Sequence, residues 1–279
     1  MNTIRLGLIG DNIAASRAPD LHHAAARLCG IDVIYERLVP LDLGLVFDDV
    51  VARARRDGFL GLNITHPYKE RVLHFVKVDD PNVKMIGACN TVLFGEPSIG
   101  FNTDYTGYIA AFRGRFGNRL PGAVAMAGSG GVGKAVAFAL AELGAKSLKL
   151  FDTDTRKSGA VAAALKQQHA RMPVFVAPSL KDACESADGL VNCTPQGMIG
   201  YGGNAFAGIT LRGRQWICDV VYTPLETTFL NEGAAAGLEF LNGYELFLFQ
   251  GVHAFKLFTG QEIDVGKLRQ ALANMPQIL

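Results

Sequence analysis

Residues 123–133 read Ala-Val-Ala-Met-Ala-Gly-Ser-Gly-Gly-Val-Gly, and this stretch decides the fold of the second half of the chain. Its apolar start, Val124–Ala127, predicts a buried strand, and the residues after the glycines predict a helix over Val132–Leu143. Glycines occupy the three positions of the G-x-G-x-x-G pattern, directly between that strand and that helix. This context is typical of a dinucleotide-binding loop and disfavours a flexible surface loop.

The predicted helix is amphipathic and is followed by a second strand. Its apolar side chains recur at helical spacing, and Gly144 is typical of a left-handed cap at the helix end. Leu148–Phe151 predicts the second strand, which completes a right-handed βαβ unit of about thirty residues. The glycines of such a unit make a tight turn, let the backbone approach a pyrophosphate and pack the helix against the sheet. We therefore expect the dinucleotide at Gly128, Ser129, Gly130, Gly131, Val132 and Gly133.

Asp152 follows the second strand, 24 positions after Gly128. An acidic side chain near this offset, roughly 20 residues, accepts hydrogen bonds from a ribose diol. The carboxylate would repel the 2′-phosphate of NADP, and Arg156 is the one nearby arginine that could receive it. The alternative is a turn or helix cap, because Asp and Thr are common in both. The position favours the cofactor role and predicts NAD over NADP.

Strands and helices alternate along the whole chain, which predicts an α/β protein of two domains. Short apolar runs in the first hundred residues alternate with amphipathic segments. Residues 113–122 are polar and rich in glycine and predict a loop before the second domain, where the alternation is that of a Rossmann-like, doubly wound parallel sheet. We expect one α/β domain over residues 1–106, joined by a closing helix over 244–279 whose apolar part is Leu246–Phe258, and a NAD domain over 107–243. The strands predicted outside the βαβ unit are Ile4–Ile9, Val33–Val39, Leu60–Ile64, Thr91–Phe94, Leu190–Asn192, Gln215–Val221 and Leu238–Leu241.

The bulk composition favours a globular protein that handles a small molecule. The formal net charge is +1 and the hydrophobic fraction is 49%, which favours neither nucleic acid nor an anionic membrane surface as a partner. The N-terminus lacks the pattern of a signal peptide, and no apolar run approaches the ~20 residues of a membrane span. We expect a cytoplasmic protein. The five cysteines are scattered and predict reduced core thiols, without a metal site.

Polar side chains gather in three loops of the first domain. Asn63–Lys69 follows a predicted strand, and Ala88–Val92 and Gly100–Asp104 place polar residues at the ends of apolar segments. Loops held by a rigid scaffold often carry function. We expect the three loops to converge on one pocket.

At these residues the chain resembles the shikimate dehydrogenase family. The family pattern N-[VI]-T-x-P-x-K is met by Asn63–Lys69, and its N-T-D by Asn102–Asp104. The match spans nearly the whole chain and continues through Gly87–Thr91, the glycine loop, Asn192–Met198, Asp219–Pro224 and Gln250. The resemblance implies an N-terminal substrate domain, a C-terminal Rossmann domain, and oxidation or reduction at a ring carbon of a hydroxylated cyclohexene or cyclohexane carboxylate.

The resemblance places Lys69 and Asp104 beside the reacting hydroxyl. Moving a hydride between a secondary alcohol and NAD also moves one hydroxyl proton, which a positioned acid or base must handle. A lysine near a cofactor and a carboxylate can titrate below its free value of ~10.4. Which of the two takes the proton stays open. Taken singly, Lys69 would be a solvated first-turn lysine and Asp104 a helix N-cap.

The same resemblance assigns further polar residues to the substrate and the cofactor. The residues expected to bind substrate are Ser16, Asn63, Thr65, Asn90, Tyr222 and Gln250. Those expected on the cofactor side are Thr194, Met198, Val220 and Gly243. His66 occupies a variable position of the family motif, and His22 and His23 have no metal-ligand partners at suitable spacing, so all three are interpreted as structural.

The chain departs from the family pattern near its N-terminus. The family motif for the substrate carboxylate is S-x-S-P or S-x-T-P, whereas this chain reads Ser16-Arg17-Ala18-Pro19. Ala18 therefore removes one hydroxyl donor, which Arg17 could in principle replace. In the closing helix, Leu246-Phe247 stands where methionine is frequent in the family.

We therefore expect an NAD-linked shikimate or quinate dehydrogenase, a monomer or homodimer, that works in the oxidative direction because NAD preference suits catabolism. One alternative keeps the chemistry and changes the cyclic hydroxy acid, as Ala18 suggests. The other is a sensor that binds dinucleotide and cyclitol acid without turnover. A substrate panel with NAD would separate the first two hypotheses, and tight substrate binding with no NADH formation at high enzyme concentration would favour the sensor.

Overall fold

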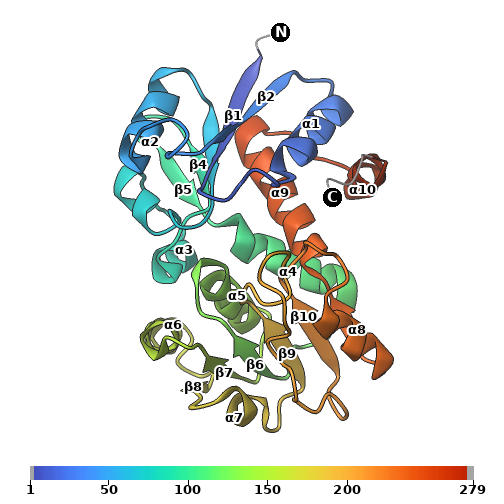
Figure 1. Cartoon of the computed structure of the whole chain (residues 1–279). Helices are drawn as coiled ribbons and strands as arrows, with labels where there is room; N and C mark the ends of the chain where they lie inside the picture. The colour runs from blue at the N-terminus through green and yellow to red at the C-terminus, as the bar shows by residue number, and fades with distance from the viewer. Residues whose placement is uncertain (1–2, 275–279) are drawn as a thin grey trace. The chain divides into compact units, whose positions relative to one another are not determined.

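The structure is a computed structural model that describes residues 3–274 (Figure 1). The chain forms two compact units, one made of Met1–Thr103 with Gln250–Leu279 and the other of Asp104–Phe249. Both boundaries fall inside helices. Each unit contains its own β-sheet, so each builds a core of its own.

The first unit alternates strands and helices before it ends in two helices. Its elements are β1 (Ile4–Ile9), α1 (Ala18–Cys29), β2 (Val33–Leu38), α2 (Phe47–Arg56), β3 (Gly61–Ile64), the 3-10 helix η1 (Arg71–Phe75), α3 (Pro81–Ile86), β4 (Thr91–Leu93) and β5 (Ile99–Phe101). After the second unit the chain returns through the helices α9 (Gly243–Thr259) and α10 (Val265–Ala273).

The sheet of the first unit is mixed, in the order β2-β1-β3-β4-β5. Strands β1, β2 and β3 are parallel, whereas β4 runs antiparallel to β3 and to β5. All four residues of β3 are buried, as expected for a central strand covered on both faces. One core cluster combines Phe47, Val50 and Val51 of α2 with Leu62 and Ile64 of β3. The carboxyl end of β3 therefore projects from a well-packed scaffold.

The second unit contains the predicted βαβ unit and three further strands. Its elements are α4 (Thr103–Phe116), β6 (Ala123–Ala127), α5 (Gly131–Glu142), β7 (Ser147–Phe151), α6 (Thr155–Gln168), β8 (Val174–Val176), α7 (Leu180–Cys184), β9 (Gly189–Asn192), β10 (Trp216–Asp219), α8 (Thr228–Ala235) and β11 (Glu239–Leu241).

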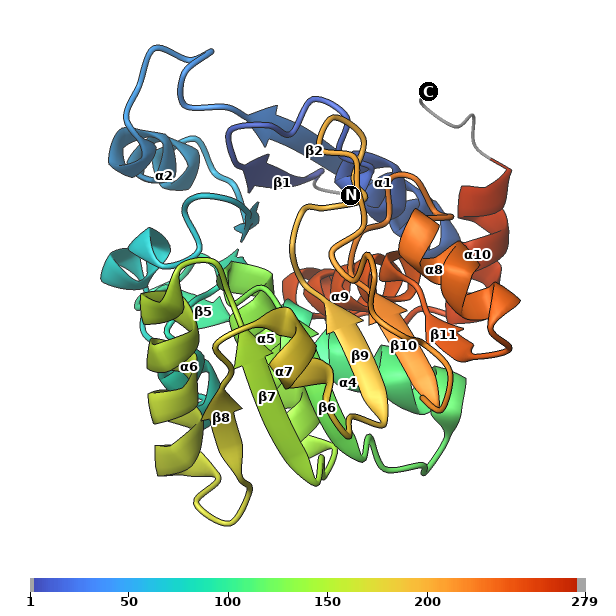
Figure 2. The ribbon, with the colours of Figure 1, turned by 60° about the horizontal axis from the view of Figure 1, so that its bottom comes forward.

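All six strands of the second sheet are parallel, in the order β11-β10-β9-β6-β7-β8 (Figure 2). Numbered from β6, this is the 3-2-1-4-5-6 order of a Rossmann sheet. The strand order reverses between β6 and β9. In open α/β sheets a ligand binds beyond the carboxyl ends of the strands at such a point. The predicted α/β class and doubly wound sheet are confirmed.

The end of α4 was predicted wrongly, whereas the closing helix predicted around Leu246–Phe258 is present as α9 and is followed by a second helix. Residues 113–116 belong to α4, because the arginines of this segment continue the helix up to Gly117, where φ is +63°. Within the described part of residues 244–279 there are two helices instead of one. Gly260, with φ +70°, follows α9, and the Asp264 side chain caps α10 by accepting from Lys267 N. Residues 275–279 of the predicted closing helix lie outside the described residues.

Candidate active site

The glycine loop forms the turn between β6 and α5. Gly128 has φ +92°, and its N–H donates to Phe151 O at 2.8 Å. A Cβ on Gly128 would lie 2.7 Å from the backbone of Cys193, and one on Gly133 would lie 2.3 Å from Gly128 O. A side chain at either position would therefore collide with the backbone. The first and third motif glycines are thus required by the fold itself.

The second motif glycine is different. A Cβ added to Gly130 would meet no protein atom within 4 Å, and its φ of −74° suits any residue. Packing within the protein therefore does not require glycine here, whereas a ligand that approached the backbone closely would require it. Next to it, the Ser129 hydroxyl is buried and has no hydrogen-bond partner among the described residues. An open backbone at a helix N-terminus beside an unpaired hydroxyl fits a dinucleotide pyrophosphate.

Asp152 lies directly after β7 and is bonded to the glycine loop. Its Oδ2 accepts from Ser129 N at 2.7 Å, and its Oδ1 accepts from Asp154 N at 2.9 Å. A carboxylate offers about four lone-pair positions, so two remain for ligand hydroxyls. The carboxylate is thus held at the loop with acceptor positions that a ribose diol could use.

A buried polar cluster joins the loops after β9 and β10. Asp219 Oδ1 accepts from Asn192 Nδ2 and from Val221 N, each at 3.0 Å, and its Oδ2 accepts from Thr227 Oγ1 at 2.7 Å. Asn192 Oδ1 in turn accepts from Thr194 N at 2.9 Å and from Thr194 Oγ1 at 2.7 Å. Burial raises the pKa of Asp219 to about 6, the largest effect on this carboxyl, although the three hydrogen bonds lower it. Asp219 and Asn192 were not predicted as site residues, although both are polar residues that end buried strands.

The residues predicted on the cofactor side lie on these same loops. Thr194 Oγ1 accepts from Gln196 N at 3.2 Å, and Met198 O accepts from Tyr201 N and Gly202 N. A Cβ on Gly243 would lie 2.4 Å from Val220 O, so the structure brings these two predicted residues into contact. The cofactor-side residues therefore border the carboxyl ends of β9 and β10.

Tyr222 is predicted to bind substrate and stacks on Phe247 of α9. The two ring centroids are 5.0 Å apart, with the planes 15° from parallel. Phe247 is one of the two residues that depart from the family pattern in this helix. Its ring therefore supports the tyrosine where the family often has methionine.

The three polar loops of the first unit are hydrogen-bonded to one another. Cys89 N donates to Lys69 O at 2.8 Å, Ile64 N donates to Asn90 O at 2.8 Å, and Asn90 N donates to Phe101 O at 3.0 Å. The three loops therefore lie side by side, and a substrate pocket where they meet stays a prediction.

Asn90 uses its side-chain oxygen to hold the start of α4. Its Oδ1 accepts from Thr103 N at 2.6 Å, from Thr103 Oγ1 at 3.1 Å and from Thr91 Oγ1 at 3.1 Å. The next residue in the chain is Asp104. None of these bonds between described residues uses Asn90 Nδ2, so its two N–H groups can serve a ligand oxygen.

Unlike Asn90, Asn63 uses both its side-chain oxygen and its side-chain nitrogen in hydrogen bonds within the protein. Its Oδ1 accepts from Tyr35 Oη at 2.8 Å, and its Nδ2 donates to Thr91 Oγ1 at 3.1 Å and to Asn90 O at 3.4 Å. His22 stacks on Tyr35, with ring centroids 4.5 Å apart, and burial lowers its pKa to about 3. An uncharged, buried histidine agrees with a structural role. Tyr35 was not predicted as a site residue, because nothing in its local sequence shows its contact with Asn63.

Of the other predicted residues, Lys69, Asp104 and Thr65 lie near the ends of elements, and Gln250 lies within a helix. Lys69 and Asp104 are both buried, with 9% and 6% of their surfaces exposed, and both have polar or electrostatic partners within the protein. Thr65 follows β3, and its N–H donates to Ile9 O at 2.9 Å. Gln250 lies in α9 and is half-buried, with a partner of its own.

Ser16 lies just before α1, and Ser16 Oγ accepts from Ala18 N at 3.3 Å. Arg17, considered as a substitute donor, instead points its guanidinium at Asp20 and at Leu272 O. Arg37 of β2 donates from Nη2 to Ser16 O at 2.7 Å. The cation that bonds to Ser16 is therefore Arg37, which was not predicted because it lies on a separate strand.

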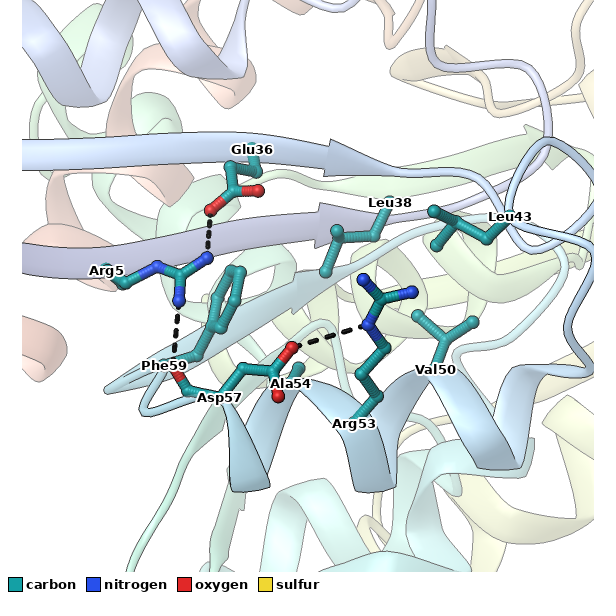
Figure 3. Close-up of a pocket in the computed structure, with 9 residues that line it drawn as sticks. All are labelled: Arg5, Glu36, Leu38, Leu43, Val50, Arg53, Ala54, Asp57 and Phe59. Atoms are coloured by element: carbon teal, nitrogen blue, oxygen red, sulfur yellow. Dashed lines mark hydrogen bonds and ion pairs between the residues drawn. The ribbon is translucent and has the colours of Figure 1, made fainter.

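A small cavity of about 90 Å³ lies elsewhere, between α2 and the β1–β2 side of the first sheet (Figure 3). Its charged residues are paired, Arg5 with Glu36 at 2.7 Å and Arg53 with Asp57 at 3.3 Å. No predicted site residue lines it. Across residues 3–274, no group of three or more His, Cys, Asp or Glu side chains could hold a metal ion, and no helix has the length and apolarity to span a bilayer.

Two family models match the chain. One, described as the shikimate dehydrogenase substrate binding domain, matches residues 8–92. The other, described as the shikimate 5'-dehydrogenase C-terminal domain, matches residues 243–273.

Similar proteins align over nearly the whole length. A quinate/shikimate dehydrogenase (NAD(+)) of Corynebacterium efficiens is 37% identical over 281 residues, covering 98% of this chain and 99% of the relative. A shikimate dehydrogenase (NADP(+)) of Streptomyces avermitilis is 38% identical over 278 residues, covering 97% and 95%. The solved structure of quinate dehydrogenase from Corynebacterium glutamicum in complex with NAD has a TM-score of 0.91 at 36% identity, covering 98% of this chain and 100% of that one. The resemblance seen in the sequence motifs is confirmed, and the chain belongs to the shikimate dehydrogenase family.

Proposed function

We propose that this protein is an NAD-dependent dehydrogenase that oxidises quinate or shikimate to the corresponding 3-dehydro ketone. The observation that carries the proposal is the glycine loop, closed by Asp152, at the reversal point of a Rossmann sheet in a member of this family. The names of the relatives include both NAD and NADP enzymes. The Asp152 carboxylate supports NAD here, because it can bind a ribose diol and repels a 2′-phosphate.

A bound dinucleotide would supply the hydride acceptor for the carbon that carries the reacting hydroxyl, and Gly128–Gly133 with Asp152 would hold it. The protein must then handle the hydroxyl proton, which we assign to the pair Lys69 and Asp104. A buried amine and a buried carboxylate suit this task, since a low-dielectric setting strengthens their effect on a reacting proton. Either one takes the proton while the other orients the hydroxyl.

Polar side chains of the loops bind the rest of the substrate. Asn90 donates from Nδ2 to a ring hydroxyl, with Thr65 and Gln250 as further ring-hydroxyl partners. Asn63 contributes chiefly by fixing Asn90 and Thr91, because its own amide is engaged within the protein. Ser16 and Tyr222 are assigned to the substrate carboxylate.

The test is NADH formation, followed by its absorbance, with quinate, shikimate and several other cyclic hydroxy acids, each with NAD and with NADP. We expect turnover of quinate or shikimate with NAD, and a lower kcat/KM with NADP. Equal or better efficiency with NADP would contradict the cofactor assignment. Tight binding of the acids by calorimetry, with no NADH formed at high enzyme concentration, would instead favour a sensor.

A second candidate substrate is another cyclic hydroxy acid, favoured by Ala18. The missing hydroxyl and the nearby Arg37 guanidinium change the donors beside Ser16. A ligand with a bulkier or differently placed acidic group would use such a site better. In the same panel, a higher kcat/KM for that acid than for quinate and shikimate would identify it.

A further inference from the structure

The N-terminus of α6 carries an internal ion pair directly beyond Asp152. The Asp154 side chain is the N-cap of this helix, and its Oδ1 accepts from Arg156 N at 3.1 Å. The same carboxylate receives both arms of the Arg156 guanidinium, from Nε to Oδ1 at 2.9 Å and from Nη2 to Oδ2 at 3.0 Å. Lys157, the next residue, also acts electrostatically on Asp154. The two cations lower the pKa of the Asp154 carboxyl, and the hydrogen bond from the Arg156 side chain is the largest cause.

These groups are the ones with which proteins bind a phosphate. A helix N-terminus offers N–H groups and a positive dipole end, and a guanidinium offers two parallel donors that match phosphate oxygens. At α6 both are already bonded to a carboxylate of the chain. The donors of an anion-binding site are therefore present, and the carboxylate of Asp154 occupies them.

We propose that Asp154 is a cofactor-specificity residue, because its carboxylate occupies the anion site that the 2′-phosphate of NADP would otherwise use. This inference rests on the proposed dinucleotide function. It adds a second determinant to Asp152, which acts through the ribose diol. In this proposal Arg156 could bind a phosphate, but its guanidinium is already bonded to Asp154.

The position of Asp154 relative to the glycine loop supports this role. Asp154 N donates to Asp152 Oδ1, and Asp152 Oδ2 accepts from Ser129 N of the loop. One hydrogen-bonded chain thus runs from the pyrophosphate-binding loop, through the carboxylate that faces the ribose, to the N-cap of α6. A 2′-phosphate extends from that same ribose.

The carboxylate of Asp154 stays in place even if Arg156 moves. Arg156 is 89% exposed, and an exposed ion pair of this kind is weak, so its guanidinium can swing away. The Asp154 carboxylate is only 30% exposed and remains bonded to Arg156 N as the helix cap. It therefore competes for Arg156 and repels a phosphate by its own charge at the same time.

The experiment uses four variants of the full chain, Asp154→Ser, Asp154→Asn, Arg156→Ala and the double variant Asp154→Ser/Arg156→Ala. Serine and asparagine cap helices about as well as aspartate, so the first two remove the charge and keep the cap. The probes are 2′,5′-ADP and 5′-ADP, with binding measured by calorimetry without turnover. The ratio of kcat/KM for NADP to that for NAD is measured in the same proteins.

In both single Asp154 variants we expect 2′,5′-ADP to bind about tenfold more tightly, while the affinity for 5′-ADP changes by no more than about twofold. The NADP-to-NAD ratio should rise by a similar factor. Arg156→Ala alone should change neither affinity. In the double variant most of the gain should disappear, and what remains reflects the lost repulsion by the Asp154 charge. An unchanged 2′,5′-ADP affinity in Asp154→Ser, or a gain in the double variant as large as in Asp154→Ser, would overturn the proposal. A parent protein that fails to bind 5′-ADP would instead contradict the proposed dinucleotide function.

Discussion

Lys69 and Asp104 are almost completely buried, which is unusual for charged residues unless they are paired or functional. We expect Lys69→Ala and Asp104→Ala each to lower kcat by roughly 10²–10⁴, the range for a positioned acid or base. NAD affinity should stay nearly constant, because neither residue is assigned to the cofactor. The measurement is steady-state kinetics with fluorescence titration of NAD, and Lys77→Ala at an exposed lysine is the control. Near-normal kcat in either variant would remove that residue from the proton-transfer pair.

Ala18 begins α1 beside Ser16, so a hydroxyl added there would lie near the assigned carboxylate site. A charge-assisted hydrogen bond contributes about 1.5–3 kcal/mol, so Ala18→Ser should lower KM for shikimate or quinate roughly 10- to 100-fold. The change should fall on KM, because the carboxylate is remote from the reacting carbon. Ala15→Ser adds a hydroxyl to an exposed alanine of the same loop and should have no effect. A serine variant no better than the parent would point to another substrate.

At the scale of elements, the β6–α5 turn separates what the fold requires from what the ligand requires. A Cβ on Gly133 would lie 2.3 Å from Gly128 O, whereas one on Gly130 would meet nothing. Gly133→Ala should therefore lower the melting temperature, since the backbone must shift. Gly130→Ala should leave the melting temperature of the free protein unchanged and weaken NAD binding at least about tenfold, because the pyrophosphate needs that space. If Gly130→Ala bound NAD normally, the loop would not be the pyrophosphate site.

Asp219, whose carboxylate joins the loops after β9 and β10, should make the free energy of unfolding depend on pH. The pKa of Asp219 is raised from 3.8 to about 6 in the folded protein. The contribution of the protonated carboxyl to the free energy of unfolding is therefore fully present below pH 3.8 and is lost as the pH rises through 6. Between pH 5 and pH 8 this loss is on the order of 1 kcal/mol. Asp219→Asn cannot titrate. We expect the difference in unfolding free energy, parent minus variant, to fall by that amount from pH 5 to pH 8 in urea titrations. A constant difference would show that Asp219 does not titrate in this range.

The elements also show where sequence patterns succeed. The βαβ unit was predicted to within one residue at each boundary, because the glycine motif and the apolar periodicity both mark it locally. Strand β8 was not predicted, because it is a three-residue edge strand whose Phe175 is 54% exposed and gives no buried pattern. The end of α4 was misplaced because its Arg-Gly-Arg composition is typical of loops.

For the whole molecule, a preference for NAD over NADP should appear as a larger increase in melting temperature when NAD is added. A ligand that binds the folded state alone stabilises it by about 2.7 kcal/mol at 100 times its Kd. NAD should therefore raise the melting temperature more than the same concentration of NADP. Asp152→Ala should narrow the difference, because it removes both the ribose bond and the repulsion of the phosphate. Equal shifts with the two dinucleotides in the parent would contradict NAD preference. The change in melting temperature does not depend on turnover, so it reports the preference for NAD or NADP whether the protein is an enzyme or a sensor.

The sequence by itself determined the α/β class, the Rossmann half, the family and the loops that carry polar residues. Each of these depends on contiguous residues, where spacing and composition act over a few positions. Only the tertiary structure decided which side chains meet. Tyr35 reaches Asn63 across 28 positions, Asn192 reaches Asp219 across 27, and Arg37 reaches Ser16 across 21. Asn192 and Asp219 lie on neighbouring strands, Tyr35 and Asn63 lie on the two strands that flank β1, and Ser16 lies in the loop after β1, next to the strand of Arg37. The order of parallel strands, which no local pattern encodes, brings them within hydrogen-bond distance.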